Sequence, residues 1–537
     1  MRECRHIGMN SGTLLERRLA MKRLSCVVLA VVMVVAGTAA ADTTLLNHAY
    51  IDAGDGGKLK YSGGATVLTP SATAVTVGGV TYDYQYDVAG NLDLDGYNIR
   101  GAINTTTSQS SAYFKVAGNV ANSGAGGDGS FYTYTTQAHR YPDHVRVDAG
   151  GSLTVNNVWT DPYYNNDGGD VYLYAKNGAV AVTGYVDTHS DMYNKYGGNI
   201  TLRSEGAGAG ITVSGQAASG DGAGHSLISG DNTPLDAGAI KLYTPGDVNL
   251  TAGIYARRAN GDVTIRGDAA NAALRAGDVT IGGDINTHAS NSQRRAGDVV
   301  VLANSLDLDG NLLIHSTGGS SWAGDLDIDV LGDCTIAGYI RANNTNTQQS
   351  CAPGKVDITA LHLAVNGANG GLSIDTSAVF TGGFDSDKAL PAASDVTLTG
   401  VDTSLMRYTD PLVGATSSIY LAGGITTSAG DRRYASPDFY GDVTLSAVEV
   451  QLGGNITVEH TTLSDIDVHY GVTTYGIVTH LMENGAYWDG VSAHNITYGV
   501  GPTTFTADVP YAGLPVPEPA GLSLLGLALL GLRRKRS

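Results

Sequence analysis

A short phrase recurs through the middle of this chain and constrains its fold more than any other feature. It begins with Gly, continues with Asp or Asn, and then alternates aliphatic, polar and aliphatic residues, as in "GDVTI". Copies begin at Gly246, Gly261, Gly277, Gly297 and Gly324, at intervals of 15, 16, 20 and 27 residues. Repetition at this spacing predicts an architecture in which each unit stacks on the next.

Each copy of the phrase has the pattern of a short strand. In the copy at Gly277, Val279 and Ile281 share one face because they lie two residues apart, while Thr280 faces the other way. β-Branched residues suit a half-buried pleated surface, and the preceding Gly permits a tight corner. The pattern predicts an all-β fold, an elongated right-handed parallel β-helix (solenoid), whose loops of different length leave at one corner.

The repeats are clearest over residues 151–460, which we assign to the β-helix body. We expect a β-rich N-terminal cap at 42–150 and a β-rich C-terminal cap at 461–515, because the open ends of a solenoid must be covered. In the unit that begins at Gly168, the side chains expected to face inward are Val171, Leu173, Val180, Val182 and Val186.

Two units of the body are nearly the same. Asp187-Thr188-His189 and Asn286-Thr287-His288 occupy equivalent places, 99 residues apart, and a weaker third copy begins at Gly338. We expect the loops that follow these residues to leave one edge together and to form the variable face, where binding usually concentrates.

The "GGDV" and "GNI" strand starts, with "G-I-D-T" style corners, resemble the filamentous-haemagglutinin-like β-helix repeats of bacterial surface and secreted proteins. The resemblance covers about residues 150–460 and is one of repeat style. The chain lacks the N-terminal secretion domain of the two-partner type and a C-terminal run like an autotransporter barrel. The resemblance therefore implies a surface or secreted protein with a different export route.

Residues 1–41 have the features of a leader that contains a secretory signal peptide. A basic start at Met21-Lys22-Arg23 precedes an apolar run, and Ala39-Ala40-Ala41 precedes Asp42 as a small-residue cleavage pattern. We expect translation to start at Met21 and cleavage to fall between Ala41 and Asp42. An uncleaved membrane anchor is the alternative, which the short apolar run disfavours.

Residues 516–537 carry the most specific pattern in the chain. Val516-Pro517-Glu518-Pro519 is followed by an apolar run and then by Arg533-Arg534-Lys535-Arg536. This order resembles the PEP-CTERM sorting signal of certain Gram-negative bacteria. The resemblance implies export across the inner membrane, recognition by an exosortase, and removal of a tail that holds the chain in the membrane beforehand. The basic residues would stay in the cytoplasm. The two terminal apolar runs are expected to form short helices, and a permanent anchor is the alternative.

Two cysteines remain in the mature region. Cys334 lies in the strand phrase "GDCTI" and Cys351 in the polar stretch "NNTNTQQSCAPG". An even pair in an exported chain favours a disulfide, which would tie that stretch to the body. Two free thiols are the alternative.

The mature region is strongly acidic. The whole chain has 32 basic and 51 acidic residues, and the terminal segments contain 10 and 3 of them, which leaves a net charge of about −26. Such a surface repels nucleic acid and anionic membranes. Calcium could bridge the alternating carboxylates of Asp325, Asp327 and Asp329, but a solvated acidic face is the plainer interpretation, and we expect no metal or other cofactor.

Catalytic patterns are missing from the sequence. It has no Gly-x-Ser-x-Gly elbow, phosphate loop or zinc pattern, and His189, His225 and His288 stand apart from other catalytic residue types. We therefore expect no catalytic site and an exported structural or adhesive protein of the cell surface or extracellular matrix, associated with extracellular polysaccharide. The alternative is a β-helical polysaccharide lyase or glycoside hydrolase with a sorting tail. An aromatic sugar-binding surface is one reading of the Tyr- and Trp-containing stretch 461–510, and capping is the other.

Overall fold

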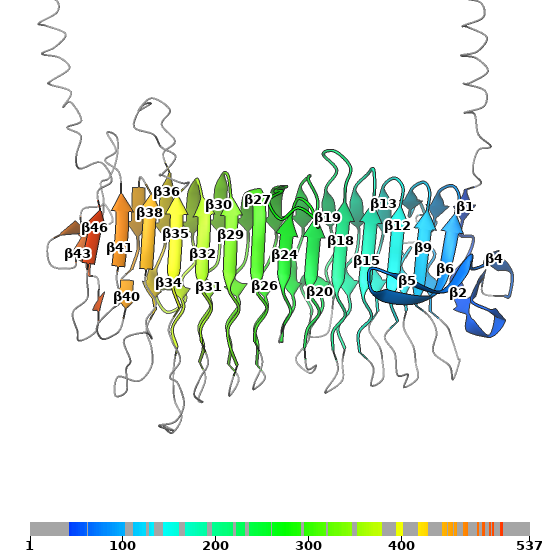
Figure 1. The fold of residues 1–537 in the computed structure, drawn as a ribbon, viewed down its shortest axis with the longest axis horizontal. Helices are drawn as coiled ribbons and strands as arrows, with labels where there is room; N and C mark the ends of the chain where they lie inside the picture. Colours follow the sequence, from blue (N-terminus) through cyan, green and yellow to red (C-terminus); the bar gives the residue numbers. More distant parts are fainter. Residues whose placement is uncertain are drawn as a thin grey trace, which may run out of the picture.

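The chain forms an elongated stack of parallel strands in the computed structural model (Figure 1). The structure describes residues 42–508 except 62, 102–110, 125–127, 134–142, 161–166, 191–195, 219–221, 231–235, 259, 291–294, 318–320, 346–351, 379–393, 401–416, 428–442, 448, 455, 459–465, 471–480, 483–485, 489–492, 496 and 499–504. Within these ranges the only helix is a 3-10 turn, η1 (Ala53–Asp55), so none is long and apolar enough to cross a membrane. The two expected terminal helices lie outside the described residues.

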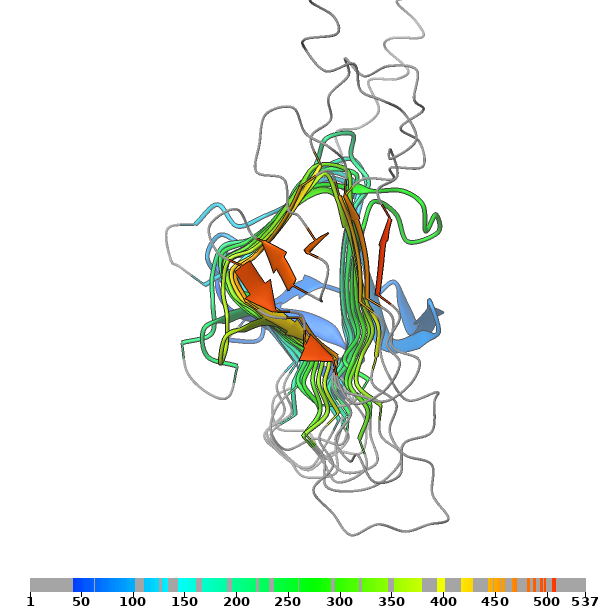
Figure 2. The same ribbon diagram turned by 90° about the vertical axis from the view of Figure 1, so that its left-hand side faces the viewer.

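The strands fall into three series, and most coils of the stack contribute one strand to each series (Figure 2). The first series is β6 (Val80–Val88), β9 (Ala112–Val116), β12 (Val145–Ala149), β15 (Val171–Ala175), β18 (Ile200–Ser204), β21 (Ile240–Tyr243), β24 (Val263–Arg266), the start of β27 (Val299–Leu308), β29 (Leu326–Val330), β32 (Val356–Ala360), β35 (Val396–Gly400), β38 (Val443–Ala447), β41 (Ile466–Tyr470) and β46 (Phe505–Asp508). The second series is β1 (Thr43–Thr44), β7 (Leu92–Asp93), β10 (Val120–Ala121), β13 (Leu153–Val155), β16 (Val180–Val182), β19 (Ile211–Val213), β22 (Val248–Leu250), β25 (Ala276–Ile281), the end of β27, β30 (Asp333–Ile336), β33 (His362–Val365), β36 (Ser418–Leu421) and β39 (Glu449–Leu452). The third series is β2 (Ala49–Asp52), β8 (Ile99–Arg100), β11 (Phe131–Tyr132), β14 (Val158–Trp159), β17 (Val186–Asp187), β20 (His225–Ile228), β23 (Gly253–Tyr255), β26 (Ile285–Asn286), β28 (Leu312–Leu313), β31 (Ile340–Arg341), β34 (Leu372–Asp375), β37 (Gly424–Thr426), β40 (Ile456–Val458) and β45 (Thr497–Tyr498).

Neighbouring coils pair in parallel, which confirms the predicted all-β, parallel solenoid. Val171 of β15 pairs with Val145 of the coil before and Ile200 of the coil after. In the first series this parallel pairing runs from β6 to β46, and β1 and β2 pair in parallel with β7 and β8, so the stacked coils also occupy parts of the two regions that were predicted to be caps.

The aliphatic side chains form one continuous core along the stack. The five residues expected to face inward from residue 171 onward are all buried in it, and so are Val263, Val279 and Val299 of later coils. Full burial of such side chains contributes about 1.5–3 kcal/mol each relative to exposure. The period-two pattern of the sequence therefore identified the interior correctly.

The Gly of the repeated phrase is needed because coils approach closely at the corners. A Cβ added to Gly324 would lie 2.0 Å from the carbonyl oxygen of Gly297 in the preceding coil, and one added to Gly354 would lie 1.7 Å from that of Gly324. No side chain fits there. The phrases at Gly297 and Gly324 precede first-series strands, whereas that at Gly246 precedes a second-series strand and that at Gly277 lies near the start of one, so the phrase occurs at two different corners of the coil.

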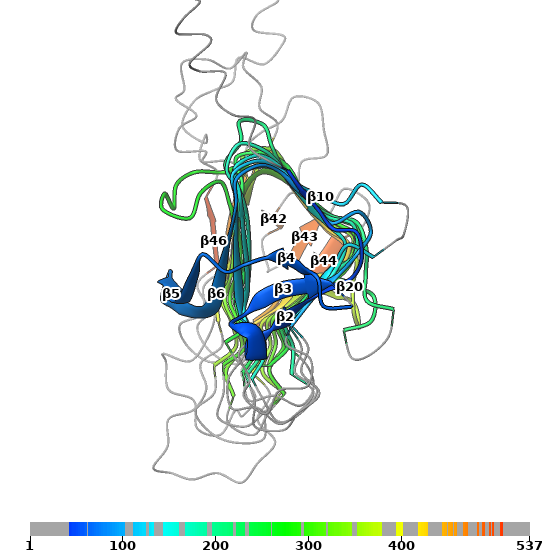
Figure 3. The ribbon, with the colours of Figure 1, turned by 90° about the vertical axis from the view of Figure 1, so that its right-hand side faces the viewer.

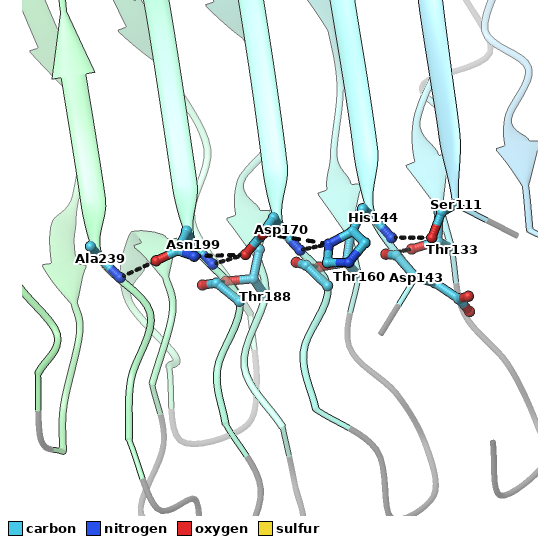
Figure 4. A network of polar contacts seen from close by, with 11 residues as sticks. Ser111, Thr133, Asp143, His144, Thr160, Asp170, Thr188, Asn199 and Ala239 are labelled. Carbon is cyan, nitrogen blue, oxygen red and sulfur yellow. Dashed lines mark hydrogen bonds and ion pairs between the residues drawn. The ribbon is translucent and has the colours of Figure 1, made fainter. Parts of the chain in front are cut away.

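The Asp or Asn of the phrase caps the next coil. Figure 4 shows the ladder from Ser111 to Ala239, in which each side chain accepts a hydrogen bond from the backbone N–H at the same place one coil later. Further along, the carboxylate of Asp298 accepts from the N–H of Asp325, and that of Asp325 accepts from the N–H of Lys355, both at 2.8 Å. These contacts satisfy backbone groups that the corner would otherwise leave unpaired.

Antiparallel strands lie at both ends of the stack. At the N-terminal end, β2 pairs with β3 (Lys58–Tyr61) and β3 with β4 (Thr66–Leu68), and these strands cross the opening (Figure 3), while β5 (Ala72–Val77) pairs with β6. Leu59 is buried there, and the ring of Tyr86 stacks on Phe114 with 4.9 Å between centroids. Near the other end, β42 (Leu481–Met482), β43 (Ala486–Trp488) and β44 (Ala493–Asn495) form a small sheet.

Candidate functional site

The loop edge is the side of the solenoid where each third-series strand passes to the first-series strand of the next coil. A buried hydroxyl closes several coils at this edge: Thr188 donates to the carbonyl of Gly198 at 2.6 Å, and Thr287 to that of Gly297 at 2.7 Å. Asp187 and Asn286 lie in the same column, through Ile228 and Tyr255 of the coils between them. The predicted equivalence of the two similar units is therefore confirmed.

A polar strip runs along the loop edge from β23 to β34. Its members come from consecutive coils and lie either on the outward residue that ends a third-series strand or within a few residues beyond it. We call this set the loop-edge strip: Tyr255, Arg257, His288, His315, Thr317, Arg341, Asn343 and Asp375.

His288 is held as a neutral imidazole in this strip. Arg257 donates its Nε–H to Nδ1 of His288 at 3.0 Å, so that nitrogen carries no proton. Nε2 of His288 lies 2.9 Å from the hydroxyl oxygen of Thr317 and is the nitrogen left to carry the proton. Burial and the positive charge of Arg257 lower the pKa of His288 to about 3.

His315 stacks on His288 and leaves one nitrogen without a hydrogen-bond partner. The two rings lie 4.1 Å apart at an angle of 13°. His315 is only 7% exposed, and its Nδ1 is buried without a partner. The two histidines differ in the residue that precedes each by one coil. His288 follows Arg257, which donates to its Nδ1, whereas His315 follows His288, whose ring stacks on it and donates no hydrogen bond to Nδ1. Burial, His288 and Arg341 lower the pKa of His315 to about 2.

Two arginines flank the histidine pair. Arg257 also donates to the hydroxyl of Tyr255 at 3.2 Å, and Arg341 donates its Nε–H to the side-chain oxygen of Asn343 at 3.0 Å. In the described part of the chain, neither arginine forms an ion pair with a carboxylate, although Arg275 on the same body pairs with Asp329 at 2.6 Å. The strip therefore keeps a positive charge on an otherwise acidic protein.

Other histidines of the sequence have local partners. His189 lies at the same edge three coils earlier, where its Nδ1 is 2.5 Å from the carboxylate of Asp187. The ring of His225 packs against Tyr255 with 4.8 Å between centroids, and burial lowers its pKa. Sequence reasoning singled out His288 and His189 but missed Arg257, His315 and Arg341.

The acidic calcium candidates lie close together but are largely occupied. Asp325 caps the next coil and pairs with Arg295 at 2.7 Å, and Asp329 pairs with Arg275. Burial and the neighbouring carboxylates raise the pKa of Asp327, because no cation compensates it as closely. Over the described ranges, no group of three or more His, Cys, Asp or Glu side chains could hold a metal ion.

Cys334 is fully buried in the core and is paired in register with Leu306 and Leu363. Burial raises its pKa to about 12. Cys351 lies outside the described residues, so the bridge remains a prediction.

Asp42 accepts a hydrogen bond from the N–H of Asn91 at 2.9 Å. Ala39 and Ala41, the motif Val516–Pro519 and the basic tail 533–536 lie outside the described residues, and so do the side chains of the aromatic stretch 461–510.

A second polar surface lies on the first-series face near the N-terminal end. The guanidinium of Arg146 lies 4.0 Å from the centroid of the Tyr172 ring and 5.3 Å from that of Tyr113, and it pairs with Asp148 at 3.0 Å. Tyr113 also donates to Asp148 at 2.8 Å. Arg146 is neutralised by one carboxylate oxygen of Asp148, although Oδ1 of Asp148 is buried without a hydrogen-bond partner, so this surface lacks the uncompensated positive charge of the loop-edge strip.

The loop-edge strip offers groups that can hydrogen-bond to a ligand, but its histidines are poorly suited to acid–base catalysis. It offers guanidinium, imidazole, amide and hydroxyl groups, and its histidines are neutral with pKa values far below 7, so they are poor proton acceptors. It holds one carboxylate, Asp375, which accepts a hydrogen bond from Asn343 at 2.6 Å. The chain matches no protein-family model, no curated protein and no solved structure among those compared.

Proposed function

We propose that this chain is an exported structural or adhesive protein, displayed at the cell surface or in the extracellular matrix and sorted by an exosortase-type system. The order of its C-terminal segment carries the proposal: a Val516–Pro519 motif, an apolar run and a basic tail. The leader at 1–41 is consistent with export. The coil direction we assign is right-handed, as are nearly all parallel crossover connections.

The partner we propose is extracellular polysaccharide. A long rod presents the same edge many times along its axis, which suits a linear polymer. The loop-edge strip supplies hydrogen-bond donors on that edge, and the acidic remainder of the surface disfavours nucleic acid.

Sorting is tested with the full chain in a Gram-negative host with an exosortase and in the same host without it. We expect mass spectrometry to show loss of the C-terminal segment only when the enzyme is present. The combined changes Pro517→Ala, Glu518→Ala and Pro519→Ala should retain the tail. The matched control Pro510→Ala with Pro515→Ala alters two neighbouring prolines and should be processed normally. An intact tail in every strain would contradict the proposal.

The enzymatic alternative is tested separately. The purified protein is incubated with acidic and neutral polysaccharides, and new chain ends are measured against a heat-inactivated sample. We expect no depolymerisation. Release of chain ends by the native protein alone would establish a polysaccharide-degrading activity and replace the structural role.

A further inference from the structure

The loop-edge strip contains a positively charged patch that the fold itself does not require. Arg257, His288, His315 and Arg341 come from four consecutive coils. Since neighbouring strands lie about 4.8 Å apart, the two arginines are separated by about 14 Å along the axis. Both arginines are half-buried and Thr317 is exposed, so these side chains can be reached from outside, whereas the two histidines are each 7% exposed.

Two observations indicate that this patch has an external ligand. The first is the absence, across the described residues, of any ion pair between a carboxylate and Arg257 or Arg341, on a chain with 51 acidic residues. The second is the orphaned Nδ1 of His315, on a side chain more than nine-tenths buried. Buried polar atoms are nearly always satisfied, so an exception calls for a partner.

The charges select the chemistry of that partner. Both histidines are neutral, and the positive charge belongs to guanidinium groups, which bind carboxylates through paired, charge-assisted hydrogen bonds. The exposed hydroxyl of Thr317 adds a neutral hydrogen-bonding group of the kind that sugar hydroxyls need.

We propose that the loop-edge strip binds the carboxylate groups of an acidic polysaccharide, with Arg257 and Arg341 each contacting a carboxylate and the histidine pair between them contacting the intervening sugar. This inference rests on the proposed association with polysaccharide and gives it a site and a ligand class. Successive charges along one linear polymer can meet both arginines, which favours a polysaccharide over a single small anion.

The test uses the purified full chain and defined probes in calorimetric titrations. Oligogalacturonate is the carboxylated probe, neutral dextran the uncharged one, dextran sulfate the sulfated one and polyglutamate the acidic polypeptide. We expect oligogalacturonate to bind, dextran to show no binding, and the two other polyanions to bind at least about tenfold more weakly. The Arg257→Gln and Arg341→Gln changes should each weaken oligogalacturonate binding about tenfold.

Arg203→Gln is the matched control. It removes the same charge from the first-series face, where Arg203 already pairs with Glu205, and should leave affinity within about twofold. His315→Phe keeps a ring against His288 and removes the orphaned nitrogen, so we expect weaker binding without loss of folding.

Each unfavourable result is decisive. Absence of oligogalacturonate binding, or equal binding by the parent and both arginine variants, would overturn the site. Equal binding of polyglutamate would mean a protein or generic polyanion partner, and preference for dextran sulfate would replace carboxylate with sulfate ester. None of these binding results tests processing of the C-terminal tail, so the proposed exosortase sorting is tested separately by the mass-spectrometry experiment.

Discussion

Replacing Gly324 with Ala tests the physical reason for the repeated phrase. The new Cβ would lie 2.0 Å from the carbonyl oxygen of Gly297, and that oxygen belongs to the backbone and cannot rotate away. The coils must separate locally, which stretches the 2.8 Å bonds from Val299 N–H to the Asp325 carbonyl and from Asp325 N–H to the Asp298 carboxylate.

The cost follows from these contacts. Overpacking against rigid atoms costs about 1–3 kcal/mol, and weakening two hydrogen bonds adds about 0.5–1.5 kcal/mol each. We therefore expect the free energy of local opening to fall by about 2–6 kcal/mol. Amide hydrogen exchange is the appropriate assay, because a solenoid opens in sections and a single unfolding midpoint would not locate the defect.

Gly332→Ala is the control from the same pair of coils. Its Cβ would meet only the carbonyl oxygen of Asn304, at 3.2 Å, and Gly332 has an ordinary backbone conformation. We expect its effect to stay within about 1 kcal/mol, since losing the freedom of Gly in the unfolded chain offsets a small clash. Equal loss of protection in both variants would refute the close-approach explanation.

Three further predictions concern the core, the histidines and the thiol. Val279→Ala should lower the free energy of unfolding by about 2 kcal/mol in denaturant titrations, because it removes two buried methyl groups. The change Thr280→Ala at the exposed neighbouring residue should alter it by less than about 0.5 kcal/mol. Similar losses in the two variants would mean that the strand faces are misassigned. Burial holds the pKa of His288 at about 3 and that of His315 at about 2, below the value of 6.5 in the unfolded chain. As the pH falls below 6.5, these histidines become protonated in the unfolded state before the folded one. The free energy of unfolding should therefore fall by about 2 kcal/mol per histidine at pH 5. Calorimetry at pH 7.5 and 5 should show a loss smaller by about 2 kcal/mol in His315→Phe than in the parent, and an unchanged pH dependence would contradict the buried neutral state. Cys334 should resist alkylation in the folded, reduced protein and react once denatured, because burial raises its pKa to about 12; labelling of the native protein would show that the thiol is not in the core.

The repeated pattern predicted the core because its information is local. Alternation within five residues places Val171 and Leu173 on one face whatever the rest of the chain does. The pattern does not show at which corner of the coil a phrase lies. Gly246 and Gly297 lie at different corners, but both corners require a Gly for close approach of the coils and an oxygen acceptor to cap a backbone N–H.

The loop-edge strip could be predicted only in part, because contacts between coils, and not a local pattern, bring its residues together. His288 stood out because its unit resembles an earlier one, but Arg257 and Arg341 become its neighbours only through register, across loops of unequal length. A constant offset was the available signal: Arg257, His288 and His315 each lie two residues beyond the outward residue that ends a third-series strand.

Capping also changes the meaning of the acidity of this chain. Many of its aspartates accept a hydrogen bond from a backbone N–H at the next coil. These caps are Asp42, Asp83, Asp170, Asp247, Asp262, Asp284, Asp298 and Asp325. Asparagine serves the same purpose at Asn199 and Asn311, so the role requires an oxygen acceptor and not a charge. Part of the negative charge is therefore a by-product of building corners and is weak evidence for a metal or a cationic partner. In the described part of the chain, neither Arg257 nor Arg341 forms an ion pair with a carboxylate, and their positive charge is accordingly the stronger indication of a ligand.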